Sequence, residues 1–156
     1  WVTHERGWAT GRKSDIATRF QVMMRGLLGV GDDIDRLSDS DFEEYRKYIQ
    51  FYKEIRDVIQ FGDVYLLEKL SEKNASAIQY LSEDASEAVF SLVSQKFNFG
   101  LVYQPVTLKG LVPDAVYEIR DPDQSYESMT GLALMTIGVP PAGKWQGCRT
   151  LYLKRT

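Results

Sequence analysis

The start of the chain carries the side chains best suited to chemistry. Residues 1–12 contain two tryptophans, two arginines and the only histidine of the chain. An indole can cover the apolar face of a sugar ring, while guanidinium and imidazole groups can hydrogen-bond its hydroxyls. This composition favours a sugar-binding loop, and an ordinary packed loop is the alternative. The candidate substrate-binding residues are Trp1, His4, Arg6, Trp8 and Arg12.

The rest of the sequence lacks the groups that nucleophilic or thiolate–metal chemistry requires. A Ser–His or Cys–His pair would need His4, and there is no Gly-x-Ser-x-Gly motif. Cys148 is the only cysteine, which excludes an internal disulfide and a thiolate metal cluster. Cys148 is interpreted as a buried structural thiol. We therefore assign no catalytic residue, no metal ligand and no cofactor.

An acidic segment and a glycine-rich segment adjoin each other but fit no ligand motif. Asp32, Asp33 and Asp35 lack the 12-residue spacing and the closing glutamate of a calcium loop. They are interpreted as a solvated turn. Gly26-x-x-Gly29-x-Gly31 follows a helical pattern, so it lies at the wrong end of a helix to hold a phosphate.

The overall composition bounds the class of protein. Hydrophobic residues make up 44%, charged residues 26%, and the net charge is −3, which argues against a nucleic-acid partner because phosphate binding needs a clustered positive surface. No apolar run approaches the roughly 20 residues that span a membrane. The sequence begins at Trp1 without an initiator methionine or a signal-like segment, which indicates a fragment boundary. Localisation is left unassigned, with the cytoplasm as the default expectation.

The first part of the chain has the pattern of helices. Ser14 and Asp15 can cap a helix over residues 16–28, whose apolar residues fall on one stripe. A short strand is expected over residues 30–34, before the acidic turn.

A second, longer helix is predicted over residues 40–61. Ser40-Asp41-Phe42-Glu43 fits a capping box, and apolar residues then recur at spacings of three or four. Gly62 is expected to end this helix as a left-handed C′ residue.

After Gly62 the apolar period changes from that of a helix toward that of strands. Short strands separated by turns at intervals of roughly 10 residues favour an antiparallel sandwich or barrel. The change of pattern predicts a domain boundary near residue 63. The expected strands cover residues 64–70, 77–81, 88–93, 101–108, 116–120, 132–136 and 150–153.

Several motifs, in order along the chain, resemble the family 36 α-galactosidases. The run from Tyr52-Lys53 through Arg56 and Ile59-Gln60 to Gly62-Asp63 is similar to the last barrel helix of that family and its exit. The opening loop lacks the common Pro-Asn-His-Gln version, and residues 125–138 keep only Met129-Thr130-Gly131-Leu132 of a family pattern. Further similar segments are Val2-Thr3-His4, Gly11-Arg12, residues 18–29, Leu37-Ser38, residues 84–89 and residues 108–117.

The resemblance implies an α+β chain made of two parts. Residues 1–63 would form the last βα units of a (β/α)8 catalytic barrel, and residues 64–156 a C-terminal antiparallel β-sandwich domain. It also implies a retaining α-galactosidase whose two catalytic aspartates lie upstream of Trp1, so that this chain alone would be inactive. The implied partners are the remainder of the barrel and an α-galactoside substrate, and a homo-oligomer is also considered.

Two other classes of protein remain open at this point. One is a non-catalytic β-sandwich module that binds carbohydrate or supports a neighbouring domain. Its candidate aromatic side chains are Tyr80, Phe90, Phe97, Phe99 and Tyr103. The other is an independent helical–β interaction domain.

Overall fold

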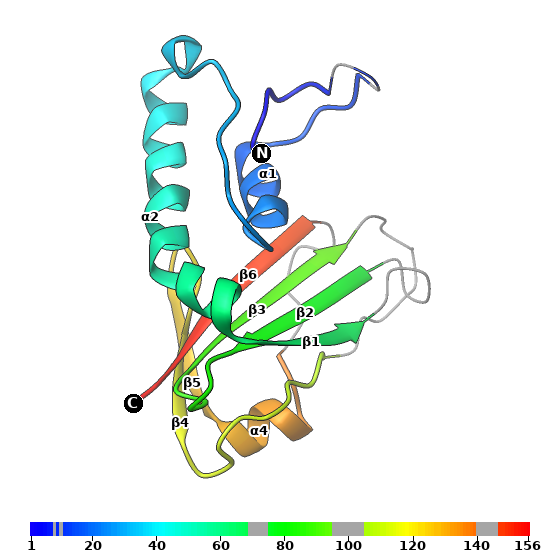
Figure 1. Ribbon diagram of the computed structural model, residues 1–156, viewed down its shortest axis with the longest axis vertical. Helices are drawn as coiled ribbons and strands as arrows, with labels where there is room; N and C mark the ends of the chain where they lie inside the picture. Colours follow the sequence, from blue (N-terminus) through cyan, green and yellow to red (C-terminus); the bar gives the residue numbers. More distant parts are fainter. Residues whose placement is uncertain (8, 10, 69–74, 95–104, 140–146) are drawn as a thin grey trace.

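The computed structural model describes residues 1–7, 9, 11–68, 75–94, 105–139 and 147–156. A helical part comes first and an antiparallel sheet follows it (Figure 1). The elements, in order, are α1 (Ile16–Met23), the 3₁₀ turn η1 (Ile34–Arg36), α2 (Asp39–Phe61), β1 (Asp63–Glu68), β2 (Ala75–Leu81), β3 (Glu87–Ser94), β4 (Val116–Arg120), β5 (Ser125–Thr130), α4 (Gly131–Thr136) and β6 (Gly147–Arg155).

α1 begins where the sequence predicts and ends earlier. The Asp15 carboxylate accepts a hydrogen bond from the Thr18 amide at 2.6 Å, which satisfies an amide that the helix leaves unpaired. The helix closes with the Met24 amide donating to the Phe20 carbonyl. Of the strand expected over residues 30–34, only Val30 takes part in a bridge, and a 3₁₀ turn begins at Ile34.

α2 has one buried face and one charged face, as its periodicity predicts. Its cap is Ser38 rather than Ser40, with the Ser38 hydroxyl accepting from the Asp41 amide at 3.2 Å. The cap therefore lies two residues earlier than expected. The buried residues of α2 are Tyr45, Tyr48, Phe51, Tyr52, Ile55, Val58 and Ile59.

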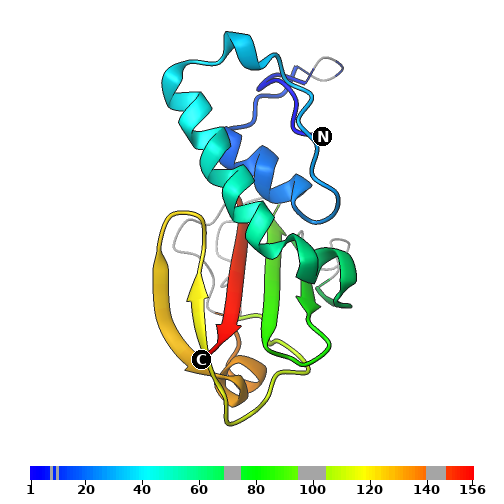
Figure 2. The same ribbon diagram turned by 60° about the vertical axis from the view of Figure 1, so that its left-hand side comes forward.

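The described strands form one six-stranded antiparallel sheet in the order β1-β2-β3-β6-β4-β5. β6, the last strand in sequence, lies between β3 and β4 and so joins two sets of strands. α1 and part of α2 lie against one face of the sheet, and α4 lies on the other side (Figures 1 and 2).

The predicted sandwich of two facing sheets is not what the described residues form. The face with Tyr80, Val89 and Tyr152 packs on α1 and α2. The opposite face packs on α4 and on the segment around residues 106–111. Because helices and an irregular segment cover the two faces, the described strands need no second sheet to bury their apolar side chains.

Two further strand assignments differ from the sequence prediction. Residues 132–136 lie in α4, which Thr130 caps by accepting from the Ala133 amide at 3.2 Å. β5 was not predicted, because its burial pattern is mostly exposed and it lacks an alternating apolar pattern. Of the strand expected over residues 101–108, positions 101–104 lie outside the described residues, and Val106 forms only an isolated bridge with Val139.

Gly62 ends α2, but for a different reason from the one expected. Its φ is −78° and its ψ is 164°, an extended conformation rather than a left-handed one. A Cβ atom at this position would lie 2.5 Å from the Val58 carbonyl oxygen and 2.6 Å from the Leu81 carbonyl oxygen. Glycine is therefore required by the close approach of two backbone segments.

The apolar core beneath the helices continues across residue 63. It joins side chains of α1 and α2 to Tyr80, Val89 and Tyr152 of the sheet. Lys47 of α2 also pairs with Asp123 at 2.6 Å in the turn between β4 and β5. The helical part and the sheet thus share one packed interface. None of the helices in the described ranges is long and apolar enough to cross a membrane.

Candidate functional site

Two short extended segments lie side by side in the helical part of the chain. Val2 and Val30 form an isolated parallel bridge. The Val2 amide donates to the Gly29 carbonyl at 2.7 Å, and the Gly31 amide donates to the Val2 carbonyl at 2.8 Å. α1 connects the two segments, because parallel neighbours need a crossover connection. The residues that follow Val2 and Val30 therefore emerge at the same end of the pair.

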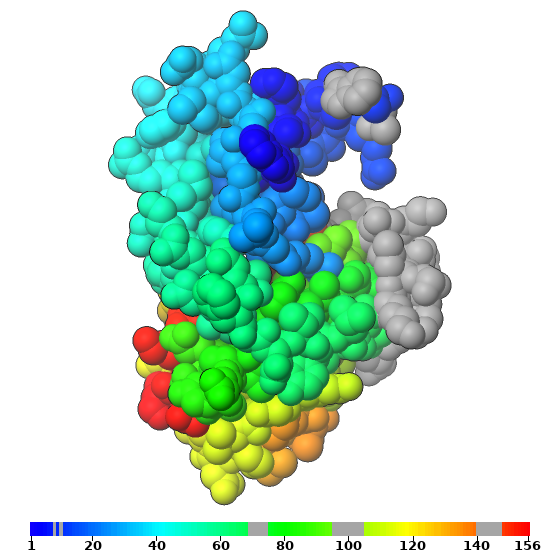
Figure 3. Space-filling model, viewed as in Figure 1, coloured from blue at the N-terminus to red at the C-terminus, as the bar shows by residue number. Residues whose placement is uncertain are grey.

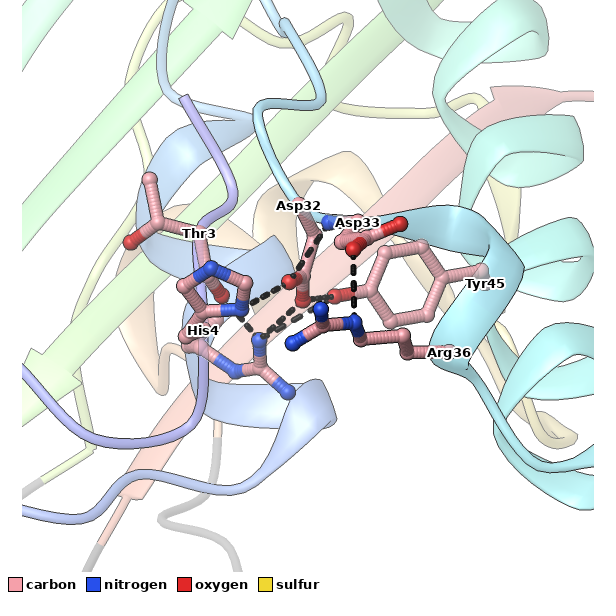
Figure 4. Close-up of polar contacts among 7 residues, drawn as sticks. Thr3, His4, Asp32, Asp33, Arg36 and Tyr45 are labelled. Carbon is pink, nitrogen blue, oxygen red and sulfur yellow. Dashed lines mark hydrogen bonds and ion pairs between the residues drawn. The ribbon is translucent and has the colours of Figure 1, made fainter.

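A polar cluster lies at that end, formed by His4, Arg19, Asp32 and Tyr45 (Figure 4). We call it the Asp32 cluster after its central carboxylate, which is only 6% exposed. His4 Nδ1 pairs with Asp32 Oδ1. The Tyr45 hydroxyl donates to Asp32 Oδ2 at 2.5 Å, and Arg19 Nη1 lies 3.3 Å from the same oxygen.

The helices hold this cluster in place. α1 supplies Arg19, which also donates to the Thr3 carbonyl and to the Tyr45 hydroxyl. α2 supplies Tyr45, whose ring meets the ring of Phe20 edge-on at 4.9 Å. The cluster thus links the first extended segment, α1 and α2 through one buried carboxylate.

The surroundings of Asp32 lower its pKa. Burial alone would raise the pKa of this carboxyl, but hydrogen bonds from Tyr45, the Asp33 amide and Arg19 outweigh it, together with the electrostatic attraction of His4. Burial, with the hydrogen bond to Asp32, raises the pKa of Tyr45 to about 12. Asp32 is therefore an anion and Tyr45 a neutral donor at neutral pH.

Acid should weaken the fold through Asp32. Because its folded-state pKa lies below the unfolded value of about 3.9, its contribution is fully present above that value and is lost as pH falls through the folded pKa. The difference in unfolding midpoint between wild type and Asp32→Asn should therefore shrink as pH falls below about 4. Asp35→Asn, at an exposed position, is the control. A difference that stays constant from pH 7 to pH 2 would contradict this expectation.

Trp1 lies on the side of the extended pair that faces away from the helices. Val2 points into the helical core, so its neighbour Trp1 points the other way. A Cβ atom at Gly31 would lie 2.9 Å from Trp1 Cε3, and one at Gly29 would lie 3.4 Å from Trp1 Cδ2. The indole thus covers two glycines while remaining 76% exposed. The N-terminal residues, in darkest blue, lie open on the face shown in Figure 3.

A small hairpin after Val2 carries two further predicted site residues. Arg6 forms an isolated antiparallel bridge with Lys13, and its side chain is exposed. Arg12 is also exposed on this small hairpin. Trp8 lies outside the described residues. Of the five candidates, the structure places His4 against the buried Asp32 carboxylate and Trp1 over the adjacent glycines.

Sequence reasoning missed the centre of the site. Asp32 was interpreted as part of a solvated turn, whereas its carboxylate is buried and accepts hydrogen bonds. Its partners Arg19 and Tyr45 come from two helices, 13 residues away on either side. No local spacing signals such a cluster. An arginine and a tyrosine on the two predicted helices were the only sequence features that pointed to the cluster.

A hollow lies between α4 and the sheet. Its volume is about 510 Å³, and its lining includes Tyr126, Glu127, Leu134 and Arg149. The Arg149 guanidinium lies 4.7 Å from the centre of the Tyr126 ring. Glu127 is the only carboxylate among the described lining residues, so two-carboxylate chemistry has no basis there. Within the described ranges, no group of three or more His, Cys, Asp or Glu side chains is arranged to hold a metal ion.

Of the aromatic candidates for a carbohydrate-binding face, the two that the structure describes are buried. Tyr80 and Phe90 are 5% and 1% exposed, and they point to opposite faces of the sheet, each inside a core. Phe97, Phe99 and Tyr103 lie outside the described residues.

The fold is that of an antiparallel β domain whose sheet is covered on one face by α1 and part of α2. Residues 75–149 match the sequence model of the glycosyl hydrolase family 36 C-terminal domain. The whole chain is similar in structure to two solved family 36 proteins. The α-galactosidase AgaB from Geobacillus stearothermophilus gives a TM-score of 0.88 at 27% identity, over 99% of this chain and 21% of that one. The galactosidase domain of AgaSK gives a TM-score of 0.84 at 27% identity, with the same coverage.

The chain is also similar in sequence to α-galactosidases. The α-galactosidase AgaA of Geobacillus stearothermophilus is 35% identical over 112 residues, which are 70% of this chain and 15% of the relative. Mel36A of Lactobacillus acidophilus is 33% identical over 116 residues, 74% of this chain and 16% of the relative. The chain belongs to glycoside hydrolase family 36 and corresponds to the C-terminal portion of its members. It spans about a fifth or less of the length of these relatives.

Proposed function

We propose that this chain is the C-terminal portion of a retaining α-galactosidase. In this proposal residues 1–63 complete the (β/α)8 catalytic barrel and residues 64–156 form the C-terminal β domain. The observation that carries the proposal is the similarity of 99% of the chain to family 36 α-galactosidases, at TM-scores up to 0.88.

The parallel pairing of Val2 and Val30 supports the barrel assignment for residues 1–63. A strand, a helix, a parallel strand and a second helix make up two successive βα units, and such units build a (β/α)8 barrel. Trp1, Gly29 and Gly31 lie on the face of the pair that points away from the helices. In a closed barrel that face would point inward, toward strands supplied by the upstream part of the enzyme.

The same arrangement supports a position for the Asp32 cluster at the catalytic end of the proposed barrel. Active sites of (β/α)8 enzymes lie at the carboxyl ends of the strands, and both His4 and Asp32 follow a strand at that end. His4 is therefore proposed to contact the substrate. Trp1, Arg6, Trp8 and Arg12 complete the proposed set of substrate-binding residues. The partners in this proposal are the rest of the barrel and a terminal α-galactoside.

Catalysis itself is assigned to aspartates upstream of Trp1. A retaining glycosidase holds two carboxyl groups about 5–5.5 Å apart, one as nucleophile and one as acid/base. Both oxygens of Asp32 are already engaged by His4, Arg19 and Tyr45. A carboxylate held in this way is not free to attack an anomeric carbon. The chain alone is therefore proposed to be inactive.

An assay of the purified chain tests this assignment. With an aryl α-galactoside as substrate, we expect no turnover above the blank, because the carboxylate pair is absent. AgaA is the positive control. A chimera in which this chain replaces the matched C-terminal portion of AgaA should hydrolyse the substrate. Turnover by the chain alone that is abolished by a substitution within it would overturn the proposal.

A further inference from the structure

His4 stands apart in the Asp32 cluster because it is largely exposed while its partner is buried. The His4 side chain is 67% exposed, against 6% for Asp32. Nδ1 of the ring faces a carboxylate oxygen, which can only accept a hydrogen bond, so Nδ1 must carry a proton. The second ring nitrogen, Nε2, points away from Asp32 (Figure 4).

Asp32 is itself fixed from several directions. Its Oδ1 accepts from the Asp33 amide at 3.0 Å as well as from His4. Its Oδ2 accepts from Tyr45 at 2.5 Å and from Arg19 at 3.3 Å. Four donors on two oxygens leave the carboxylate little freedom to rotate. A fixed acceptor then fixes the orientation and the tautomer of the imidazole that it holds.

We infer that Asp32 is a positioning residue for His4. It holds the neutral imidazole in the Nδ1–H tautomer, so that the Nε2 lone pair faces the end of the strands as a hydrogen-bond acceptor. The group that it suits is a hydroxyl, the donor that a sugar offers in greatest number. This choice of ligand rests on the proposed function, whereas the control of the tautomer does not.

The tautomer can be measured directly because His4 is the only histidine in the chain. In the ¹⁵N-labelled chain, two-bond correlations from the ring protons distinguish a protonated nitrogen from an unprotonated one. The spectrum is recorded at alkaline pH, and the tautomer is assigned from the form in which one ring nitrogen is protonated and the other is not. We expect Nδ1 to be the protonated nitrogen in the wild-type chain.

Matched variants separate positioning from a general effect of charge. Asp32→Asn keeps the shape of the side chain but removes its charge, and should shift the population toward the Nε2–H tautomer. Tyr45→Phe removes one hydrogen-bond donor to Asp32 and should shift the tautomer population of His4 by a smaller amount. Asp33→Asn removes the same charge from the adjacent residue, whose side chain pairs with Arg36, and should leave the tautomer unchanged.

The amide spectrum of each variant reports whether the chain is still folded. The inference would be overturned if the Nε2–H tautomer predominated in the wild-type chain. It would also be overturned if folded Asp32→Asn gave the same imidazole spectrum as the wild type. Failure of the activity assignment would leave this measurement unaffected, because it uses neither substrate nor the rest of a barrel. A failure here would conversely leave the activity assignment standing.

Discussion

Replacing Gly62 with valine is expected to lower the free energy of unfolding by about 2–3 kcal/mol. A Cβ atom at this position would lie 2.5 Å from the Val58 carbonyl oxygen and 2.6 Å from the Leu81 carbonyl oxygen. Both contacts are with backbone, which cannot move aside as a flexible side chain can. The end of α2 or the β1–β2 pairing must shift to make room. Chemical denaturation of the folded chain would measure this loss.

Gly26 provides a matched control for this substitution. No atom lies within 4 Å of a Cβ added at Gly26, and its φ is not in the left-handed region. Gly26→Ala should therefore change the free energy of unfolding by no more than about 0.5 kcal/mol. Unfolding midpoints for Gly62→Val that match those of Gly26→Ala would show that the junction tolerates a side chain.

Gly62 also shows what the sequence could and could not reveal about the fold. That a glycine ends the helix follows from the change of apolar period on either side of it. One of its two constraints is the carbonyl of Leu81, 19 residues along the chain, and no local pattern reports such a contact. Steric exclusion between two segments is a tertiary property, so the expected left-handed conformation was wrong although the position was right.

The length of an element decided how well its type could be predicted. α2 runs over 23 residues, so its apolar stripe repeats often enough to identify a helix. α4 has only 6 residues, and its apolar residues fit a short strand equally well. β2 and β3 were predicted as strands because their apolar residues lie between turn segments. β5 has a mostly exposed pattern and gave no such signal.

The candidate site was predicted only in part for a similar reason. His4 was recognised because its residue type and its neighbours suggested chemistry. Asp32 was not, because its burial depends on Arg19 and Tyr45, which two separate helices bring to it. From the sequence alone, a carboxylate in an acidic run is expected to be solvated. The packing of those two helices is what buries it. The site emerges from packing rather than from spacing along the chain.

Arg25 is the residue whose loss should most weaken the attachment of α1 to the sheet. It follows α1, and its guanidinium reaches two serines that lie 51 and 66 residues further along the chain. Nε and Nη1 donate to the Ser91 and Ser76 hydroxyls at 2.9 and 3.0 Å. Nη2 donates to the carbonyls of Ser76 and Ser91 at 2.6 and 2.8 Å. These four bonds tie the end of α1 to both β2 and β3.

The arrangement is unusual because neutral oxygens, rather than a carboxylate, accept all four bonds. Burial lowers the pKa of Arg25, which reflects the cost of removing the cation from water. Hydrogen bonds to a charged group contribute about 1.5–3 kcal/mol each when buried. All four bonds together are needed to offset the cost of removing the Arg25 cation from water. A lysine in the same place could not reproduce the planar fork of donors.

We expect Arg25→Ala to lower the free energy of unfolding by about 3 kcal/mol and Arg25→Lys by about half as much. Arg56→Ala, which removes an exposed arginine of α2 near Asp57, is the matched control and should cost less than about 0.5 kcal/mol. Amide exchange in Arg25→Ala should accelerate in α1 more than in the β3–β6 pair, because α1 alone loses its attachment. Equal losses for Arg25→Ala and Arg56→Ala, or uniform acceleration of exchange, would contradict this role. Since α1 also carries Arg19, a loosened helix would withdraw a donor from Asp32, and the imidazole spectrum of His4 would report that change.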